Sequence, residues 1–323
     1  MLPAFAYVRP RSIPEAIKHL SDQGARAHAG GTDLLGCLRD SAFSSAKLVS
    51  LGSLQELRGI RESVDGLRIG ALTTISEVAT SPVVRKRYPV LAQAAAEVAS
   101  PQLRNQGTIG GNLCQKPRCW YYRGEFHCVR KGGSTCFAMA GQNEYHCILG
   151  GDGCYIVHPS DTAPALVALG ASVLIAGPGG TKTLPMQELY VMPAKDPKKE
   201  TVLQPNEIIT EILIPSPPAG LLSSYRKVRA RRSWDFALAS VALALTMQHG
   251  QVAYARVVLG GAAPAPWRSK EAEEAITGKR LDAPTIATAA ESAVAKAQPM
   301  EHNAYKVALF KGLMEEQLEM MAG

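Results

Sequence analysis

Apolar and polar positions alternate in short segments along the first two thirds of the chain, with helical and strand periods following one another. Ser12-Ile13-Pro14-Glu15 and Thr74-Ile75-Ser76-Glu77 have the pattern of capping boxes and predict the starts of two helices, the first ending by Gly24. An Ala-rich segment at 90–99 predicts a third helix, and Asp161 is expected to cap a fourth over 164–169. Short apolar runs between turn signals predict strands at 26–29, 47–50, 67–70, 172–176, 182–184 and 207–214.

The last third of the chain has a different pattern. Val241, Leu243 and Leu245 alternate with small residues, as expected of a strand packed on one face of a sheet, and 252–259 predicts its hairpin partner. Helices are predicted at 270–277, 285–297 and 304–321. A Pro- and Gly-rich linker at 215–220 precedes this region, so we interpret residues 216–323 as a separate α+β domain with a small antiparallel sheet and helices.

Residues 112–157 show no sustained period and are rich in glycine, and irregular segments of this length in compact domains are usually functional. Five cysteines lie between residues 115 and 155: Cys119, Cys128, Cys136, Cys147 and Cys154. Thiolates are soft ligands that suit iron–sulfur clusters or zinc. The spacing has no Cys-x-x-Cys pair, which is atypical of a zinc ribbon, but on chemistry alone a structural zinc site stays open.

Composition narrows the classes of function. The 323 residues are 46% hydrophobic, enough for two or three domains, and carry a net charge of +7. Such a charge favours acidic partners or phosphate-bearing ligands, although no basic run interleaved with aromatic residues points to nucleic acid. The chain has seven cysteines, an odd number, and no visible signal peptide or apolar span, so we expect it in the reducing cytoplasm. The alternative is export of the folded protein to the periplasm together with a partner.

Two glycine-rich segments could each bind a phosphate. Glycines without a Cβ let the backbone approach a pyrophosphate and direct consecutive N–H groups toward it. Gly30-Gly31 and Gly110-Gly111 are such pairs, and Thr32, Thr108 and Asn112 add polar side chains. Neither segment has the Gly-x-Gly-x-x-Gly fingerprint of a Rossmann fold, and each alone is as easily an ordinary turn.

Three ordered motifs carry a resemblance that covers nearly the whole chain. They are Ala29-Gly30-Gly31-Thr32-Asp33-Leu34-Leu35, Arg104-Asn105-Gln106-Gly107-Thr108-Ile109-Gly110-Gly111-Asn112 and Pro159-Ser160-Asp161-Thr162-Ala163-Pro164-Ala165-Leu166. The chain resembles the FAD-binding subunit of the xanthine dehydrogenase family of molybdenum hydroxylases. The resemblance implies an α+β fold, with a two-subdomain FAD-binding domain of the PCMH (vanillyl-alcohol-oxidase-like) type over 1–215 and a C-terminal α+β domain over 216–323.

The resemblance also implies that the FAD pyrophosphate lies between the first two motifs. The FAD contacts implied in this way are Ala29, Gly30, Gly31, Thr32, Asp33, Leu34, Thr108, Ile109, Gly110, Gly111, Asn112, Asp161, Ile209 and Lys227.

The cysteine-rich insert, at about 114–155, is similar to that in the flavin subunits of 4-hydroxybenzoyl-CoA reductase and of bacterial periplasmic aldehyde oxidoreductases. In those subunits the insert carries a [4Fe–4S] cluster. The matching pieces imply the ligands Cys119, Cys128, Cys136 and Cys154. Cys147 has no counterpart, and we expect it to be free, with Cys37 and Cys114 as small buried residues. We expect no metal ligation by the histidines of the segment.

The function implied by the resemblance is electron transfer, with no catalytic residue in this chain. The chain is expected to relay electrons through FAD and [4Fe–4S] between an external carrier, such as ferredoxin, and partner subunits. The partners are a large molybdenum-cofactor subunit and a small subunit with two [2Fe–2S] clusters. Two alternatives are a stand-alone FAD oxidase and a zinc-stabilised binding protein without enzyme activity.

Overall fold

A computed structural model describes residues 1–231 and 234–322, in which three sheets follow one another along the chain. The first is a small parallel sheet in the order β1-β3-β2, and parallel neighbours require crossover connections. Its elements are β1 (Ala6–Val8), α1 (Ile13–Leu20), β2 (Ala25–His28), α2 (Leu34–Arg39), β3 (Lys47–Ser50) and the 3₁₀ turn η1 (Gln55–Leu57).

The start of α1 differs in one detail from the expected capping box. The Ser12 hydroxyl accepts from the Glu15 N–H, at 3.3 Å, as predicted. The Glu15 carboxylate, however, accepts from the N–H of Arg11 instead of that of Ser12. The second predicted box is complete: Thr74 and Glu77 satisfy each other's N–H groups at the start of α3.

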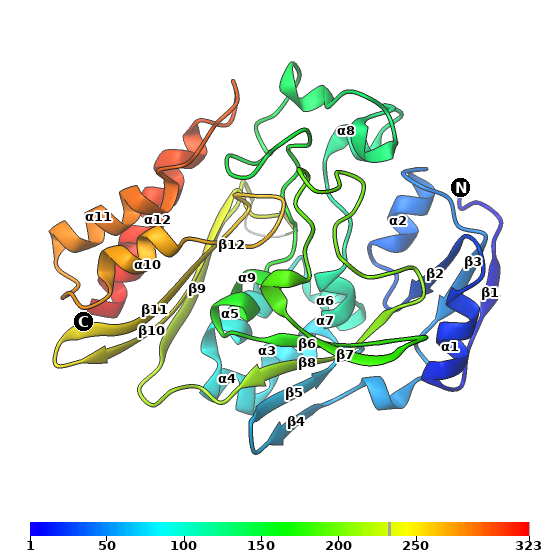
Figure 1. Cartoon of the computed structure of the whole chain (residues 1–323), viewed down its shortest axis with the longest axis horizontal. Helices are drawn as coiled ribbons and strands as arrows, with labels where there is room; N and C mark the ends of the chain where they lie inside the picture. Colours follow the sequence, from blue (N-terminus) through cyan, green and yellow to red (C-terminus); the bar gives the residue numbers. More distant parts are fainter. Residues whose placement is uncertain (232–233, 323) are drawn as a thin grey trace.

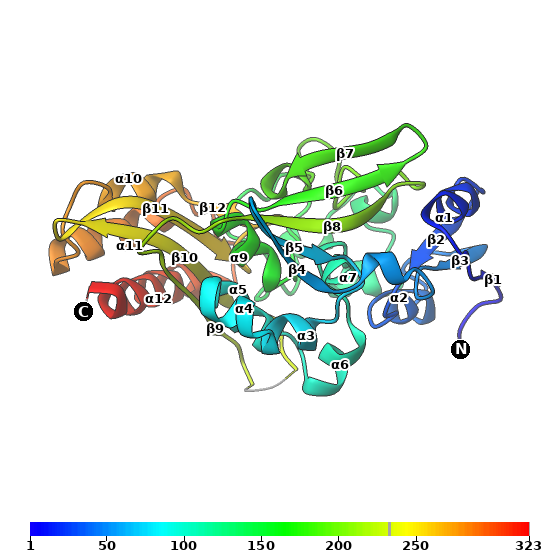
Figure 2. The ribbon, with the colours of Figure 1, turned by 90° about the horizontal axis from the view of Figure 1, so that it is seen from below.

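The second sheet is antiparallel, in the order β4-β5-β8-β6-β7, and forms the centre of the molecule. Figure 2 shows helices α3–α5 on one side of it, and side chains of the sheet and of α3, α5 and α9 form the largest core. The strands are β4 (Ile60–Ser63), β5 (Gly66–Gly70), β6 (Ser172–Gly177), β7 (Gly180–Pro185) and β8 (Ile208–Pro215). The helices are α3 (Ile75–Thr80), α4 (Pro82–Arg87), α5 (Pro89–Ala96), α6 (Pro101–Gln106), α7 (Ile109–Leu113) and α9 (Thr162–Ala168), with the 3₁₀ turn η4 (Met186–Glu188).

The third sheet, in the order β12-β11-β10-β9, is antiparallel and belongs to the C-terminal part. Its elements are β9 (Leu222–Val228), β10 (Ala239–Gln248), β11 (Gln251–Gly260), β12 (Trp267–Arg268), α10 (Lys270–Ile276), α11 (Ala283–Val294) and α12 (Tyr305–Ala322). Figure 1 shows these three helices on the outer side of the sheet, at the end of the molecule opposite the N-terminal sheet.

The expectation that β10 packs on one face only is wrong. Val241, Leu243 and Leu245 belong to the core with α10–α12, as the alternation predicted. The intervening Ala242 and Ala244 are also buried, in the central core, because α5 and α9 contact β10 from the other side. Alanine at these positions leaves room for those helices, so a pattern of large and small residues here reflects two buried faces.

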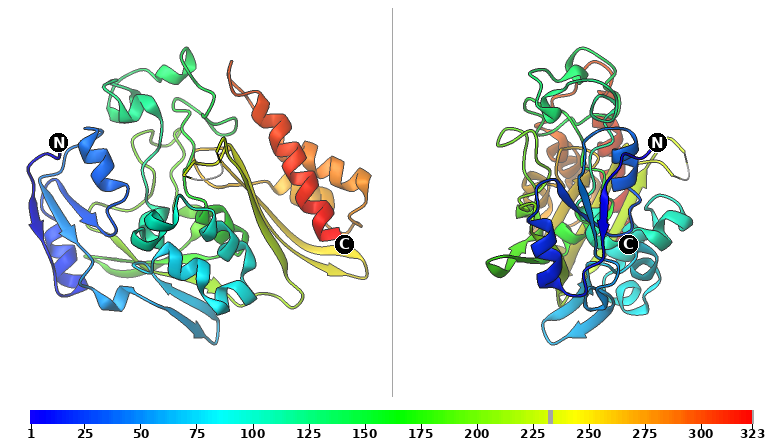
Figure 3. Two further views of the ribbon diagram at one scale, coloured as in Figure 1. Left: turned by 180° about the vertical axis from the view of Figure 1, so that it is seen from behind. Right: turned by 90° about the vertical axis from the view of Figure 1, so that its right-hand side faces the viewer.

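The cysteine-rich insert extends from the central part of the molecule at one edge, between the N-terminal sheet and the C-terminal helices (Figures 1 and 3). It was expected to lack regular structure, yet it contains short helical turns: α8 (Trp120–Arg123), η2 (Val129–Lys131) and η3 (Phe137–Met139). Among the described residues, no helix combines the length and the apolar character that a membrane crossing requires.

Candidate cofactor-binding site

A cavity of about 1060 Å³ lies between the N-terminal sheet, the central sheet and β9. This is the upper end of the size range of ligand pockets and suits a large cofactor. The expected FAD contacts that line it are Ala29, Gly30, Gly31, Thr32, Asp33, Leu34, Thr108, Gly110, Gly111, Asn112, Asp161, Ile209 and Lys227. Ile109 differs from the others, because its side chain is fully buried in the central core.

The two glycine motifs pack directly against each other. A Cβ built on Gly30 would lie 2.1 Å from the carbonyl oxygen of Gln106, which belongs to the second motif. Gly31 has φ +73°, a conformation that side chains other than glycine rarely adopt. Gly30 therefore allows the two loops to approach, and Gly31 allows the first loop to turn into α2.

Gly110 is also required by packing against the core. A Cβ at Gly110 would lie 2.9 Å from the Cβ of Ala71, and its N–H bonds the Ala71 carbonyl. Close packing against the core therefore already requires glycine at this position, whatever occupies the cavity. Beside it, Thr108 caps α7 by accepting from the Gly111 N–H at 3.2 Å.

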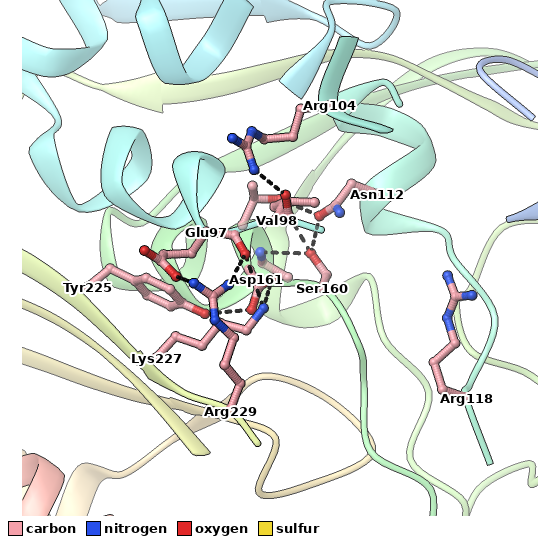
Figure 4. Close-up of polar contacts among 12 residues, drawn as sticks. Glu97, Val98, Arg104, Asn112, Arg118, Ser160, Asp161, Tyr225, Lys227 and Arg229 are labelled. Carbon is pink, nitrogen blue, oxygen red and sulfur yellow. Dashed lines mark hydrogen bonds and ion pairs between the residues drawn. The ribbon is translucent and has the colours of Figure 1, made fainter. Parts of the chain in front are cut away.

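Asn112 connects the second motif with the third. Its side-chain oxygen accepts from the hydroxyls of Ser160, at 2.5 Å, and Thr162, at 2.7 Å. Ser160 and Asn112 lie side by side in Figure 4. The second and third motifs are thus joined by hydrogen bonds in one wall of the cavity.

Asp161 forms a buried ion pair with Lys227. The Lys227 Nζ lies 2.7 Å from Asp161 Oδ2, and the side chains are 1% and 6% exposed. The Tyr225 hydroxyl donates to Asp161 Oδ1 at 2.8 Å, and burial, with the adjacent carboxylate, raises the pKa of Tyr225 well above its ordinary value. Figure 4 shows both β9 side chains converging on Asp161, which places a compensated pair of charges at the cavity wall.

The prediction that Asp161 occupies the N-cap position of α9 is confirmed, but its carboxylate makes no capping hydrogen bond. The hydroxyl of Ser160 accepts from the Ala163 N–H instead, at 3.0 Å. The two donors from β9 outcompete a local cap because they satisfy a buried carboxylate with one opposite charge and one hydroxyl.

Asp33, in the first motif, is bound by the insert. Its carboxylate lies 3.0 Å from Arg118 and 2.7 Å from Arg123, and it accepts from the Lys116 N–H at 2.7 Å. The guanidinium of Arg118 also lies over the ring of Phe236, 4.6 Å from its centroid. The backbone of Asp33 lines the large cavity, while its side chain attaches the insert to the glycine loop.

Four cysteines line a second, much smaller cavity inside the insert. They are Cys119, Cys128, Cys136 and Cys154, the four expected ligands. The cavity measures about 10 Å³, the space of a single water centre. Within residues 1–231 and 234–322, no three His, Cys, Asp or Glu side chains are placed so that they could hold a metal ion as they stand.

The thiols around this cavity differ in acidity. Hydrogen bonding from Cys136, together with the charge and hydrogen bond of Arg130, lowers the pKa of Cys154 to about 6 despite its burial. The same hydrogen bond and burial raise the pKa of Cys136. Burial raises the pKa of Cys119 to about 11. One thiolate is thus favoured at neutral pH, and it is the one beside the guanidinium.

Cys147 lies outside the small cavity, as expected of the cysteine without a counterpart. Burial raises its pKa to about 12, and its N–H donates to the carbonyl of Tyr155. Cys37 is fully buried, whereas Cys114, expected to be buried, is partly exposed.

Sequence analysis did not identify several polar residues at these cavities. His146 Nε2 lies 3.3 Å from the Cys119 sulfur, and burial lowers the pKa of His146 to about 4. Glu200 lines the large cavity and forms ion pairs with Lys116 and Arg130. A lone histidine in a loop and a glutamate far along the chain carry no local signal that would have singled them out.

Comparisons with known proteins find matches that together extend over nearly the whole chain. Residues 3–217 match the model of the FAD binding domain in molybdopterin dehydrogenase, and residues 223–321 match that of the CO dehydrogenase flavoprotein C-terminal domain. The aldehyde oxidoreductase FAD-binding subunit PaoB of Escherichia coli K12 is 37% identical over 316 residues, 95% of each chain. The carbon monoxide dehydrogenase medium chain of Hydrogenophaga pseudoflava is 29% identical, covering 93% of this chain and 89% of its own.

Solved structures match over the same extent. Carbon monoxide dehydrogenase from Hydrogenophaga pseudoflava aligns with a TM-score of 0.77 and 28% identity over 98% of this chain and 96% of its own. Quinoline 2-oxidoreductase from Pseudomonas putida 86 aligns with a TM-score of 0.78 and 27% identity over 100% and 98%. These matches extend over the central cavity and the C-terminal sheet alike.

Proposed function

Because the chain belongs to the FAD-binding subunits of the xanthine dehydrogenase and CO dehydrogenase family, we propose that it is the FAD- and [4Fe–4S]-containing electron-transfer subunit of a molybdenum hydroxylase complex. In this proposal residues 1–215 form the FAD-binding domain and 216–323 the C-terminal domain. The partners are a large subunit with the molybdenum cofactor and a small subunit with two [2Fe–2S] clusters. The cofactors supply one- and two-electron chemistry, and the chain holds and orients them.

The wall of the large cavity supports the flavin part of the proposal. The loop at Gly30 can direct backbone N–H groups toward a pyrophosphate, and the loop at Gly110, whose glycine N–H groups bond Ala71 and Thr108, lets its backbone approach closely; both line the cavity. The pair of Lys227 and Asp161 adds polar groups that can orient a ring system. A large pocket with a few convergent polar groups is what a dinucleotide cofactor requires.

The observation that supports the cluster part of the proposal is that four cysteines line one cavity. Four thiols are a donor set that suits [4Fe–4S] or zinc, and the spacing without a Cys-x-x-Cys pair, together with the resemblance of the insert, favours the cluster. The sulfurs do not stand at ligand spacing without metal. Because metal binding and local folding are coupled, we expect them to draw into place when iron binds.

The substrate class follows from similarity. The most extensive identity reported above, 37%, is with an aldehyde oxidoreductase subunit, so we propose that the partner subunit oxidises an aldehyde. In this proposal electrons leave through this chain to an external acceptor, and do not enter from a low-potential donor such as ferredoxin. We expect the complex in the cytoplasm.

The test is to purify the complex anaerobically through a tag on this chain and to assay iron, zinc and flavin. We expect iron and FAD together, with large and small partner subunits co-purifying. Cys128→Ser should lose the cluster iron and keep FAD, whereas Cys147→Ser should keep both, because Cys147 lies outside the small cavity.

Three results would contradict the proposal in different ways. Equal iron loss in Cys128→Ser and Cys147→Ser would refute the ligand assignment. Colourless protein with one zinc would replace the cluster by a structural metal. Turnover of an alcohol or aldehyde with oxygen by the purified chain alone would favour a stand-alone oxidase.

A further inference from the structure

A buried arginine connects the cysteine cavity with the large cavity. The side chain of Arg130 is 2% exposed and lines the cysteine cavity together with Cys154. On its other side, a terminal nitrogen lies 2.6 Å from Glu200 Oε1. Arg130 therefore shares one small cavity with the four expected ligands of the cluster.

Glu200 lies on the side of the large cavity. Its side chain is 8% exposed, and it forms a second ion pair with Lys116; both residues line the large cavity. The three charges form a continuous row, Lys116 to Glu200 to Arg130, that ends at the cysteine cavity. Arg130 and Glu200 are 70 positions apart in the sequence, and their ion pair joins the two cavities.

The pair of Arg130 and Glu200 is a costly arrangement if its only role is stability. Burying two charges removes them from water, and apolar residues of similar volume often stabilise a protein as well or better. The Nε of Arg130 is also buried without a hydrogen-bond partner among the described residues. A guanidinium cannot release its proton, so this position carries a permanent positive charge next to sulfur.

A fixed charge of this kind has a predictable effect on an iron–sulfur cluster. Hydrogen bonds to the ligand sulfurs and nearby positive charge stabilise the reduced, more negative state and raise the reduction potential. The low effective dielectric of a buried site strengthens the effect. Glu200, one contact further away, opposes part of that charge.

We propose that Arg130 sets the reduction potential of the cluster through its buried charge beside the four cysteines, and that Glu200 holds this arginine in place and moderates its charge. The inference rests on the [4Fe–4S] cluster of the proposed function. Arg130 is a positioning residue in this scheme, since it acts on the cluster without being one of its ligands. Electron transfer between the two cavities then depends on a potential that the insert and residue 200 set together.

The experiment is an anaerobic redox titration of the intact complex, followed by electron paramagnetic resonance of the cluster. Arg130→Gln removes the charge and should shift the midpoint potential to more negative values. We expect a change of at least tenfold in the ratio of oxidised to reduced cluster at fixed potential, about 59 mV for one electron. Arg130→Lys keeps the charge and should remain close to the unmodified protein.

Glu200→Gln distinguishes a change in charge from structural damage. Glutamine still offers an oxygen to Arg130, but the opposing negative charge is lost, so the potential should shift to more positive values. Damage to the insert would move both variants in one direction. Lys131→Gln is the matched control, because Lys131 is the next residue, loses the same charge and donates only to the Gly124 carbonyl, so little change is expected.

Failure of the inference is distinguishable from failure of the proposed function. Unmodified complex without iron removes the cluster itself. The role of Arg130 is overturned if iron is present but the midpoint potentials of Arg130→Gln and Glu200→Gln are unchanged. It is also overturned if both potentials shift in the same direction. If Arg130→Gln does not retain iron, the other two variants test the inference. Arg130→Lys should then have the midpoint potential of the unmodified protein, and Glu200→Gln should have a higher one.

Discussion

Gly30 shows how a single residue can serve the fold and a cofactor at once. The atom nearest to its missing side chain is the Gln106 carbonyl oxygen, which belongs to the backbone and cannot move aside as a flexible side chain would. The two glycine loops therefore reach their spacing only because residue 30 has no Cβ. We expect that spacing to determine whether a pyrophosphate fits between them.

Gly30→Ala should accordingly weaken flavin binding. The added methyl group would force the loops apart, and we expect at least a tenfold loss of FAD affinity, about 1.4 kcal/mol. Flavin absorbance and fluorescence of the purified complex measure it. Gly179→Ala is the control, because a Cβ at Gly179 would meet nothing within 4 Å. Full flavin occupancy in Gly30→Ala would show that the spacing of the loops does not matter.

Local chemistry explains which residues could be found from the sequence. Glycine pairs and clustered cysteines form local sequence patterns that can be recognised without knowing the fold. The structure places them around two cavities. Arg130 and Glu200 could not be paired in this way, because 70 positions separate them. Asp161 was taken for a helix cap for the same reason: its actual partner, Lys227, lies 66 positions away.

At the scale of elements, the attachment of the insert matters most. The segment around α8 has little core of its own: Tyr122 and Cys128 pack with Cys37 and Ala42 beside α2. Its polar attachment is the carboxylate of Asp33, which forms ion pairs with two arginines of the insert and accepts from one of its backbone N–H groups. The sequence predicted an irregular insert correctly in outline, but not the short helical turns or this attachment.

Asp33→Asn should loosen the insert without unfolding the rest of the chain. Removing a charge from a partly buried hydrogen-bonded group costs about 2 kcal/mol, which is roughly thirtyfold in a local opening constant. Hydrogen exchange should therefore accelerate in residues 114–131 and remain unchanged in β10 and β11. Asp22→Asn, which removes an exposed ion pair with Lys47, is the control. Equal exchange of the insert in both variants would contradict the role of Asp33.

At the scale of the whole molecule, the C-terminal part is joined to the central part by buried polar contacts as well as by apolar packing. Lys227 bonds Asp161 across this boundary, and the buried Lys306 donates to the Gly261 carbonyl within the C-terminal part and to the Tyr145 carbonyl of the insert. The alternation in β10 predicted only one buried face, because nothing local reports that a second layer packs on it. The arrangement of the parts depends on long-range contacts, which local patterns in the sequence do not reveal.

His158 lies at this boundary and makes the stability of the molecule depend on pH. The backbone N–H of His158 donates to the Ala263 carbonyl at 2.9 Å. Its side chain is buried, and the centroid of its ring lies 4.5 Å from that of Tyr190. Burial lowers the pKa of His158 from 6.5 to about 3. Above pH 6.5 the imidazole is neutral in both the folded and the unfolded chain, so it makes no difference there.

Below pH 6.5 the unfolded chain takes up a proton at His158 and the folded chain does not, so the free energy of unfolding should fall between pH 6.5 and pH 3. The loss approaches about 1.4 kcal/mol per pH unit. His158→Phe keeps an aromatic ring against Tyr190 but cannot bind a proton, so chemical denaturation from pH 7 to pH 4.5 should give a shallower dependence. His249→Asn, at an exposed turn, should retain the dependence of the unmodified chain, and parallel curves for all three proteins would show that His158 does not contribute.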